Sequence, residues 1–140
     1  MAPILVLWLG YGMASKVAMA VLIIFFPVAS SFYSGMRRTE SDLLELARIM
    51  NAKPSAVLTA VVIPSSLPAL ASGLRVATAV APIGAVVGEW VGSSAGLGFA
   101  MLHANARMQI DIMFAALTML AAASLALYFL LDALLRRLVF

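Results

Sequence analysis

The chain has 140 residues, of which 64% are hydrophobic and 11% are charged, and its formal net charge is +3. A soluble domain of this size cannot bury so much apolar side chain, so the composition excludes an ordinary soluble protein and favours an integral membrane protein. The absence of cysteine excludes disulfides and thiolate metal or redox sites. Basic residues stand at the edges of apolar runs and form no patch, which argues against nucleic acid as a partner.

The first quarter of the chain predicts one partial and one complete membrane span. Residues 3–14 are apolar but too short to cross about 30 Å of hydrocarbon, so we expect a partial span there. Residues 17–36 carry no charge and are long enough to cross, and Pro27 is expected to kink that helix. Because the chain opens inside an apolar run, without the pattern of a signal peptide, we expect it to be one part of a longer membrane domain.

A polar segment over residues 37–64 follows this span. Its hydroxyl residues Thr39 and Ser41 are expected to cap a helix over about 41–52, with acidic residues in the first turn, where the helix dipole favours them. Polar and apolar side chains take opposite faces of that helix. Pro54 should end it and can also begin the next helix.

The next apolar run, residues 56–74, is uncharged but does not predict a span. Pro64 and Pro68 interrupt it, and a span there would leave too few apolar residues for the next one. A span over 66–90 is the better placement, with Arg75 in its inner part. An arginine at the middle of a membrane costs up to about 3 kcal/mol, and less where it lies against protein.

The last third of the chain predicts one more complete span. A turn-rich segment over 93–98 comes first, followed by a short amphipathic segment that carries His103 and Arg107. A solvated helix face explains these two side chains better than a contact with an anionic solute or a binding protein. Residues 110–134 then contain an uncharged run long enough to cross the membrane.

The distribution of basic residues predicts the orientation. Six lie on one side of the predicted spans and two on the other. The six are Arg37, Arg38, Arg48, Lys53, Arg136 and Arg137, and the two are Lys16 and Arg107. The positive-inside rule then puts residues 37–64 and the C-terminus in the cytoplasm. The expected fold is an all-α integral membrane protein with about three full spans and a partial one.

Residues 45–64 carry a spaced motif. Glu-Leu-Ala at 45–47 is followed, after three residues, by Asn51, and after nine more by Val-Val-Ile-Pro at 61–64. This register resembles the EAA loop of binding-protein-dependent ABC importer permeases, where Glu-Ala-Ala, Gly and Ile-x-Leu-Pro stand at the same spacing. Asparagine is the residue that best imitates glycine in a left-handed conformation, so Asn51 is expected to keep the turn.

The resemblance implies a type I ABC importer-like transmembrane helix bundle with a cytoplasmic EAA-type coupling loop, as a single, partial permease domain over residues 1–140. A short helix near 53–60 would dock into a cleft on an ATPase, with Glu45 reaching a basic partner; the alternative is a plain solvated loop. The residues that the resemblance assigns to ATPase coupling are Glu45, Ala47, Asn51, Lys53, Pro54, Val61, Ile63 and Pro64.

The flanking segments FFPVASSFYSGMR, LPALASGLRVA and GEWVGSSAGLGFAML resemble the nitrate, sulfonate and taurine branch, which includes permeases for the pyrimidine precursor of thiamine. The resemblance covers essentially the whole chain, but only the C-terminal part of the family's usual subunit. It implies a multi-pass protein of the bacterial inner membrane that carries a small anionic or heterocyclic solute, with a hydroxymethylpyrimidine-type thiamine precursor slightly favoured.

The implied partners are an ABC ATPase subunit, a substrate-binding protein on the outer side, a second permease subunit and the lipid bilayer. The sequence has no Gly-x-x-x-x-Gly-Lys phosphate loop, so ATP hydrolysis is expected on a partner and no enzyme activity on this chain. No catalytic or metal-binding constellation is visible, and no cofactor is expected.

Two ionisable residues are candidates for the translocation path, Arg75 and Glu89, because an ionisable group at membrane depth often serves function. Glu89 can equally be an interfacial carboxylate beside Trp90. Two other classes of function stay open: a small membrane scaffold without transport, and an ion-coupled secondary carrier that uses Glu89 and Arg75. Neither of these explains the spacing of the motif.

Overall fold

The computed structural model describes residues 2–10 and 12–139, and all the regular secondary structure in this part of the chain is helical, without a strand. The all-α fold predicted from the sequence is confirmed for these residues. Tyr11, within the predicted partial span 3–14, lies outside the described residues, as do the two terminal residues.

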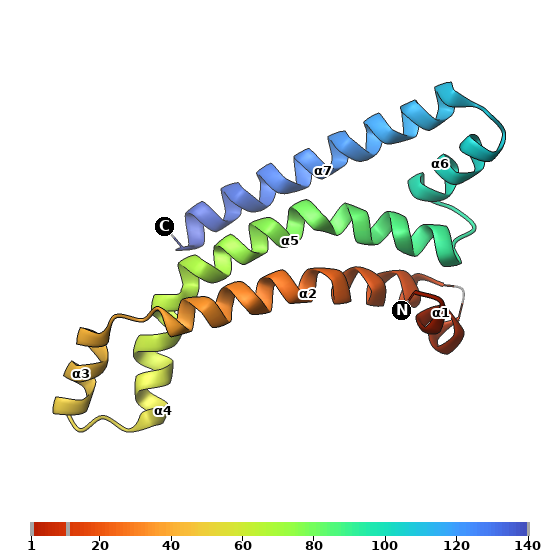
Figure 1. Ribbon diagram of the computed structural model, residues 1–140. Coiled ribbons are helices and arrows are strands. Elements are labelled where there is room, and N and C mark those ends of the chain that lie inside the picture. The colour runs from red at the N-terminus through yellow and green to blue at the C-terminus, as the bar shows by residue number, and fades with distance from the viewer. Residues whose placement is uncertain (1, 11, 140) are drawn as a thin grey trace.

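The elements follow one another with short connections (Figure 1). They are α1 (Ala2–Leu9), α2 (Met13–Arg37), α3 (Ser41–Ile49), α4 (Pro54–Val57), a π-helical turn η1 (Leu58–Val62), α5 (Ile63–Gly92), α6 (Leu97–Ala106) and α7 (Ile110–Val139). The stretches long and apolar enough to cross a membrane are Met13–Arg37, Pro54–Val91 and Ile110–Leu138. They contain the predicted spans 17–36, 66–90 and 110–134, whose membrane boundaries stay predictions.

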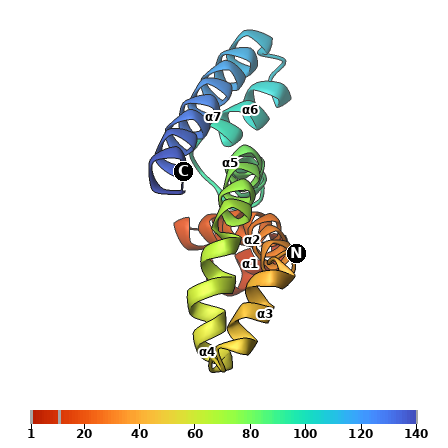
Figure 2. The same ribbon diagram turned by 90° about the vertical axis from the view of Figure 1, so that its left-hand side faces the viewer.

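The long helices α2, α5 and α7 form a layered arrangement in which α5 lies in the middle. Figures 1 and 2 show α2 along one side of α5 and α7 along the other. Helices α3 and α4 project together from one end of this arrangement, and α6 packs at the opposite end (Figure 1). The polar hairpin and the turn-rich segment are therefore separated by the whole length of the long helices.

Small residues bring α2 and α5 close together. A Cβ atom added at Gly35 would lie 2.5 Å from Cβ of Ala69, and one added at Gly73 would lie 2.7 Å from Cβ of Ser31. Ser66, on the same side of α5, is fully buried. Helices in lipid associate through close backbone approach of this kind, because lipid tails supply no hydrophobic force between them.

The prediction that Pro64 and Pro68 interrupt the helix is wrong. The helical path runs without a break from residue 54 to residue 92, so the short helix predicted near 53–60 is present as α4 but continues through η1 into α5. The π turn of η1 directly precedes Pro64, which stands in the first turn of α5. The path changes direction between α4 and α5 instead of ending (Figure 1).

The predicted hydroxyl caps of α3 are also wrong. The residue at the N-cap position is Glu40, and its side chain makes no capping hydrogen bond. The hydroxyl of Thr39 donates to a carbonyl of α2 and lies 3.1 Å from the Ser65 hydroxyl, so it ties α2 to α5. Ser41 lies inside the first turn and donates to the Asp42 carboxylate at 3.2 Å. Each hydroxyl stands one residue away from the capping position.

Candidate functional site

The turn after α3 is built around Asn51. Its φ of 54° is in the left-handed region, as the sequence predicts. The backbone N–H of Ala52 donates to the carbonyl of Ala47 at 3.0 Å, and that of Asn51 donates to the carbonyl of Arg48 at 2.9 Å. This pair of hydrogen bonds is the Schellman arrangement, which satisfies carbonyls at a helix end. The chain reverses here, and α4 returns beside α3 (Figures 1 and 2).

Helix α4 begins at Pro54, which stands in the first turn where a missing N–H costs nothing. The predicted role of Pro54 as the start of the next helix is confirmed. A groove of about 360 Å³ lies between the two arms of this hairpin. Its lining is mainly apolar and consists of Leu44, Arg48, Ala52, Pro54, Val57, Leu58 and Val62.

The residues assigned to coupling all lie on this hairpin or at its junction with α5. Among them Ala47 is buried, Val61 and Ile63 are half-buried, and Glu45, Asn51, Lys53, Pro54 and Pro64 are exposed. Within the described residues the carboxylate of Glu45 makes no hydrogen bond or ion pair. The apolar residues Ile49 and Met50 at the tip are 82% and 72% exposed. The sequence pattern did not single out this exposed apolar tip.

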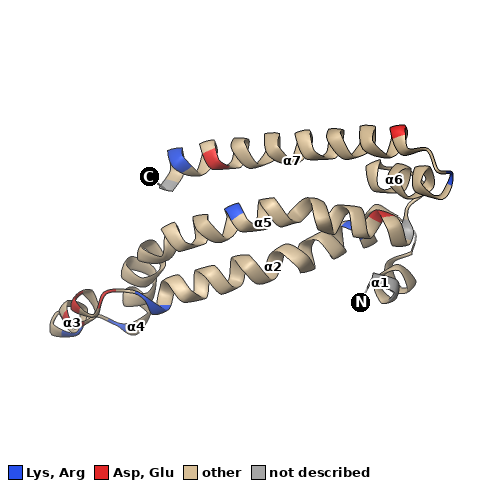
Figure 3. Cartoon of the chain, turned by 45° about the horizontal axis from the view of Figure 1, so that its top comes forward, with Lys and Arg blue, Asp and Glu red and all other residues tan. Residues whose placement is uncertain are grey.

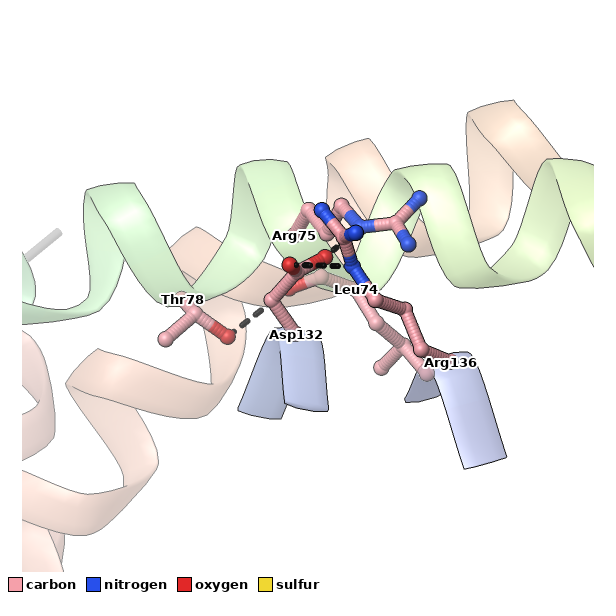
Figure 4. A network of polar contacts seen from close by, with 5 residues as sticks. All are labelled: Leu74, Arg75, Thr78, Asp132 and Arg136. Carbon is pink, nitrogen blue, oxygen red and sulfur yellow. Dashed lines mark hydrogen bonds and ion pairs between the residues drawn. The ribbon is translucent and has the colours of Figure 1, made fainter. Parts of the chain in front are cut away.

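A second polar cluster joins α5 to α7 (Figure 4). The Nε–H of Arg75 donates to Oδ1 of Asp132 at 2.6 Å, and that of Arg136 donates to Oδ2 at 2.8 Å. The side chains of Arg75 and Asp132 are 26% and 15% exposed. Close by, the hydroxyl of Thr78 donates to the carbonyl of Leu74 at 2.8 Å. No pattern in the sequence pairs Asp132 with Arg75, so this cluster was not predicted.

Asp132 lowers the cost of placing Arg75 inside the predicted span 66–90. A carboxylate between two guanidinium groups leaves one net positive charge, and each hydrogen bond replaces one that water would have made. Arg75 therefore lies against protein, where an arginine within a span costs less free energy than it does when it is surrounded by lipid.

Glu89 lies at the other end of α5 and contacts α6. Its Oε2 accepts a hydrogen bond from the N–H of Gly98 at 2.6 Å and a longer one from Phe99 at 3.4 Å. The indole N–H of Trp90 donates to the carbonyl of Gly98 at 2.9 Å. Gly96 has a φ of 135°, and a Cβ there would overlap the Glu89 carboxylate. Glu89 thus caps the first turn of α6, where the helix dipole favours a negative charge.

The two path candidates are not brought together. Arg75 and Glu89 stand on one helix, about 21 Å apart at 1.5 Å per residue, and they contact different neighbours. Within the described residues no group of three or more His, Cys, Asp or Glu side chains could hold a metal ion.

Comparison with known proteins covers the whole chain. Residues 1–140 match the family model described as the binding-protein-dependent transport system inner membrane component. The chain is 62% identical to a probable ABC transporter permease protein of Haemophilus influenzae, over 97% of the chain and 56% of that relative. It is 44% identical to the formylaminopyrimidine transport permease protein of Halalkalibacterium halodurans, over 71% of the chain and 40% of the relative.

A third relative is the riboflavin transport system permease protein of Chloroflexus aurantiacus, 39% identical over 99% of the chain and 52% of the relative. Permeases named for aliphatic sulfonates and taurine also match, so the branch identified from the flanking segments is confirmed. The chain spans about half the length of these curated relatives. No solved structure matches it.

The helical fold, the three helical stretches of membrane length within the described residues and the family match over residues 1–140 agree with one another. The chain belongs to the binding-protein-dependent transport system inner membrane components, the permease components of ABC transporters with the type I importer fold.

Proposed function

We propose that this chain forms the C-terminal part of a permease that moves a small solute across the bacterial inner membrane, driven by a separate ATPase. The observation that carries the proposal is the exposed α3–α4 hairpin, which holds most of the spaced motif of residues 45–64 away from the long helices and joins α5 at Ile63 (Figure 1). Its exposed carboxylate at Glu45, apolar tip and groove give a soluble partner both charge and apolar surface to contact.

We place the hairpin and the C-terminus in the cytoplasm. Figure 3 shows basic residues at the end of α2, on the hairpin and near the C-terminal end of α7, all toward one end of the molecule. Clustering of basic residues at one end of membrane helices supports an inner location for that end.

The coupling step follows from the continuity of α4 with α5. Because the helical path from residue 54 to residue 92 has no break, a displacement of the hairpin is transmitted directly to α5. Helix α5 is in turn packed tightly on α2 at Gly35 and Gly73. Closure of the ATPase subunits on ATP would move the hairpin, and α2 and α5 would switch together between outward-facing and inward-facing states.

The remaining partners follow from how little of the long helices is covered. In the most apolar stretch of α2 and in that of α7, only 6% of the residues are buried by the rest of the chain. Further membrane segments, a second permease subunit and lipid would cover these faces, and a substrate-binding protein would deliver the solute on the outer side, near α6.

For the solute we propose a hydroxymethylpyrimidine-type thiamine precursor, with sulfonates, nitrate or taurine as the alternatives. The relative named for formylaminopyrimidine transport supports this choice. Calorimetric titration of the cognate binding protein with these compounds tests it, and tight binding of riboflavin or taurine alone would overturn it.

Two measurements on the assembled importer test the coupling role: co-purification of the permease with the ATPase, and ATP-driven solute uptake. Glu45→Lys should lower ATP-driven uptake by about tenfold or more, because it turns a charge pair with the ATPase into a repulsion. Glu40→Lys is the matched control, since Glu40 is also an exposed carboxylate of the loop. Equal uptake by Glu45→Lys and wild type would remove Glu45 from the coupling contact.

The two rival functions predict different results. A membrane scaffold predicts that residues 45–64 tolerate scrambling when their charge is kept. An ion-coupled carrier predicts uptake that follows the proton gradient and ignores ATP depletion. The engagement of the Glu89 carboxylate by amides of α6 favours a positioning role for that residue over ion transfer.

A further inference from the structure

A polar groove of about 310 Å³ runs between α2 and α5, toward the end that carries the hairpin. Ser30, Ser34 and Arg38 recur every four residues and so share one side of α2. Ser31 stands next to them, and Ser72 lines the groove from α5. Four hydroxyls and one guanidinium group thus gather on one flank of two helices that are otherwise strongly apolar. We call these five residues the serine groove.

The hydroxyls of the serine groove differ from other serine hydroxyls in the long helices. Ser65, Ser66 and Ser124 each donate to a carbonyl of their own helix, at 2.9, 2.7 and 2.6 Å. A serine in an apolar environment makes such a bond because an unpaired hydroxyl is costly there. The four groove serines make no side-chain hydrogen bond within the described part of the chain. Their hydroxyls remain available to water or to a solute.

The floor of the serine groove is rigid. A Cβ at Gly73 would lie 3.0 Å from the Oγ of Ser31, and one at Gly35 would lie 3.2 Å from the Cβ of Ser66. The two helix backbones are therefore already as close as their side chains permit. Donors held on a fixed scaffold bind a ligand with a smaller entropic cost than donors on a mobile loop.

The opposite flank of α2 has the character of a surface that faces lipid. Phe25 and Phe32 lie there, each more than 100° around the helix from Ser34 at about 100° per residue. Phe25 is exposed in the chain. Polar groups within a membrane protein line water-filled cavities or protein contacts and avoid lipid. The two flanks of α2 therefore indicate which side of the helix faces water.

We propose that the serine groove is a water-filled contact site for a small solute rich in hydrogen-bond acceptors, whose most negative acceptor lies toward Arg38. Serine hydroxyls donate to such acceptors, and the Arg38 guanidinium makes no ion pair within the described residues. This proposal rests on the permease function proposed above and adds the residues of this chain that the solute touches.

Thiol labelling tests whether the groove is wet. The sequence has no cysteine, so each single Cys variant carries the only thiol. Ser30→Cys and Ser34→Cys should react with a charged, membrane-impermeant methanethiosulfonate at least about tenfold faster than Phe32→Cys, the control at matched depth on the other flank. Phe25→Cys is a second control on that flank, about 8 Å from Ser30 along the helix axis. The chain is labelled in inside-out membrane vesicles. Groove thiols that react no faster than the control thiols would overturn the proposal.

The acceptor that reaches the groove could come from a solute or from a lipid headgroup. The probes are formylaminopyrimidine and taurine, added to vesicles that carry Ser34→Cys, and phosphatidylglycerol, varied in the vesicle lipid. Slower labelling with one of the dissolved probes, independent of lipid composition, supports the solute site. A labelling rate that changes with the phosphatidylglycerol content and is unaffected by both dissolved probes would overturn the solute site in favour of a lipid headgroup site.

Transport measurements separate this proposal from the permease function itself. In the assembled importer, Ser34→Ala and Ser72→Ala should each reduce ATP-driven uptake at a subsaturating solute concentration by about fivefold, the effect of one lost hydrogen bond on solute binding, and Ser34→Thr should keep most of it. Ser124→Ala is the control, because that hydroxyl is bonded within its own helix. If wild type shows no ATP-driven uptake, the permease function fails. If wild type transports and both alanine variants match it, only the groove assignment fails.

Discussion

The Nε atom of Arg75 on α5 lies 2.6 Å from Oδ1 of Asp132 on α7, although 57 residues separate them in the chain (Figure 4). The second carboxylate oxygen of Asp132 is held by Arg136, one turn further along α7. A charged contact therefore reinforces the packing between the middle helix and the last helix.

Removal of Asp132 is expected to destabilise the protein more than removal of any exposed carboxylate. Asp132→Ala removes the carboxylate that the Arg75 guanidinium contacts, and breaking a partly buried ion pair in this way costs more than replacing both charges. The melting temperature in detergent should fall by several degrees, and Asp111→Ala, at the other end of α7, should leave it nearly unchanged. The double variant Arg75→Met/Asp132→Leu should recover most of the loss. A double variant less stable than Asp132→Ala alone would contradict this reading.

Asn51 is expected to tolerate glycine and little else. Asn51→Ala should cost about 1 kcal/mol, because a Cβ without a polar side chain is strained at a φ of 54°. Asn51→Gly should be neutral or slightly stabilising. It serves as the control, because it removes the side chain without introducing backbone strain. Thermal unfolding gives the free energies, and binding of the ATPase reports the orientation of the hairpin. Equal stability of the alanine and glycine variants would show that the turn carries no strain.

Met108 offers the same test at the end of α6. Its φ is 57°, and its side chain is 84% exposed, so it gains no packing in return for the strain. Met108→Gly should therefore stabilise the protein by about 1 kcal/mol. The control is Met119→Gly, the same change in a helix interior, which should destabilise by about 1 kcal/mol. Destabilisation by both changes would argue against strain at Met108.

Glu89 is expected to act on the position of α6. Glu89→Ala should cost about 1 kcal/mol, the usual effect of losing a helix cap, and Glu89→Gln should cost less because it keeps an acceptor oxygen. Hydrogen exchange at the amides of Gly98 and Phe99 should accelerate in the alanine variant. If exchange there is unchanged while uptake is abolished by both variants, a role in the translocation path becomes the better account.

Close packing between α2 and α5 should make Gly73 intolerant of any side chain. Gly73→Ala places a methyl group 2.7 Å from Cβ of Ser31, and overpacking of this kind costs about 1–3 kcal/mol. Gly12→Ala, at the N-cap of α2, is the control for an added Cβ without a clash, since a Cβ there meets nothing within 4 Å. A loss of stability for Gly12→Ala as large as that for Gly73→Ala would point to loss of glycine flexibility as the cause.

The sequence by itself determined the features that depend on residues close to one another along the chain. Uncharged runs of membrane length predict helices, the motif spacing located the hairpin, and the conformations of Asn51 and Pro54 follow from local sterics. The same local reasoning failed at Pro64, because the helical path passes through a π turn and continues beyond the proline. It failed again at Thr39, because a helix start one residue away sends the hydroxyl to another partner.

Only the tertiary structure decided which distant side chains meet. No pattern in the sequence pairs Arg75 with Asp132, directs Glu89 to the first turn of α6, or brings Ser72 beside the serines of α2. These contacts depend on how the long helices are rotated about their axes, and that rotation is set by the close approach at Gly35 and Gly73. Hydropathy fixes that a helix lies in the membrane but leaves its rotation open, because lipid solvates every apolar face equally well.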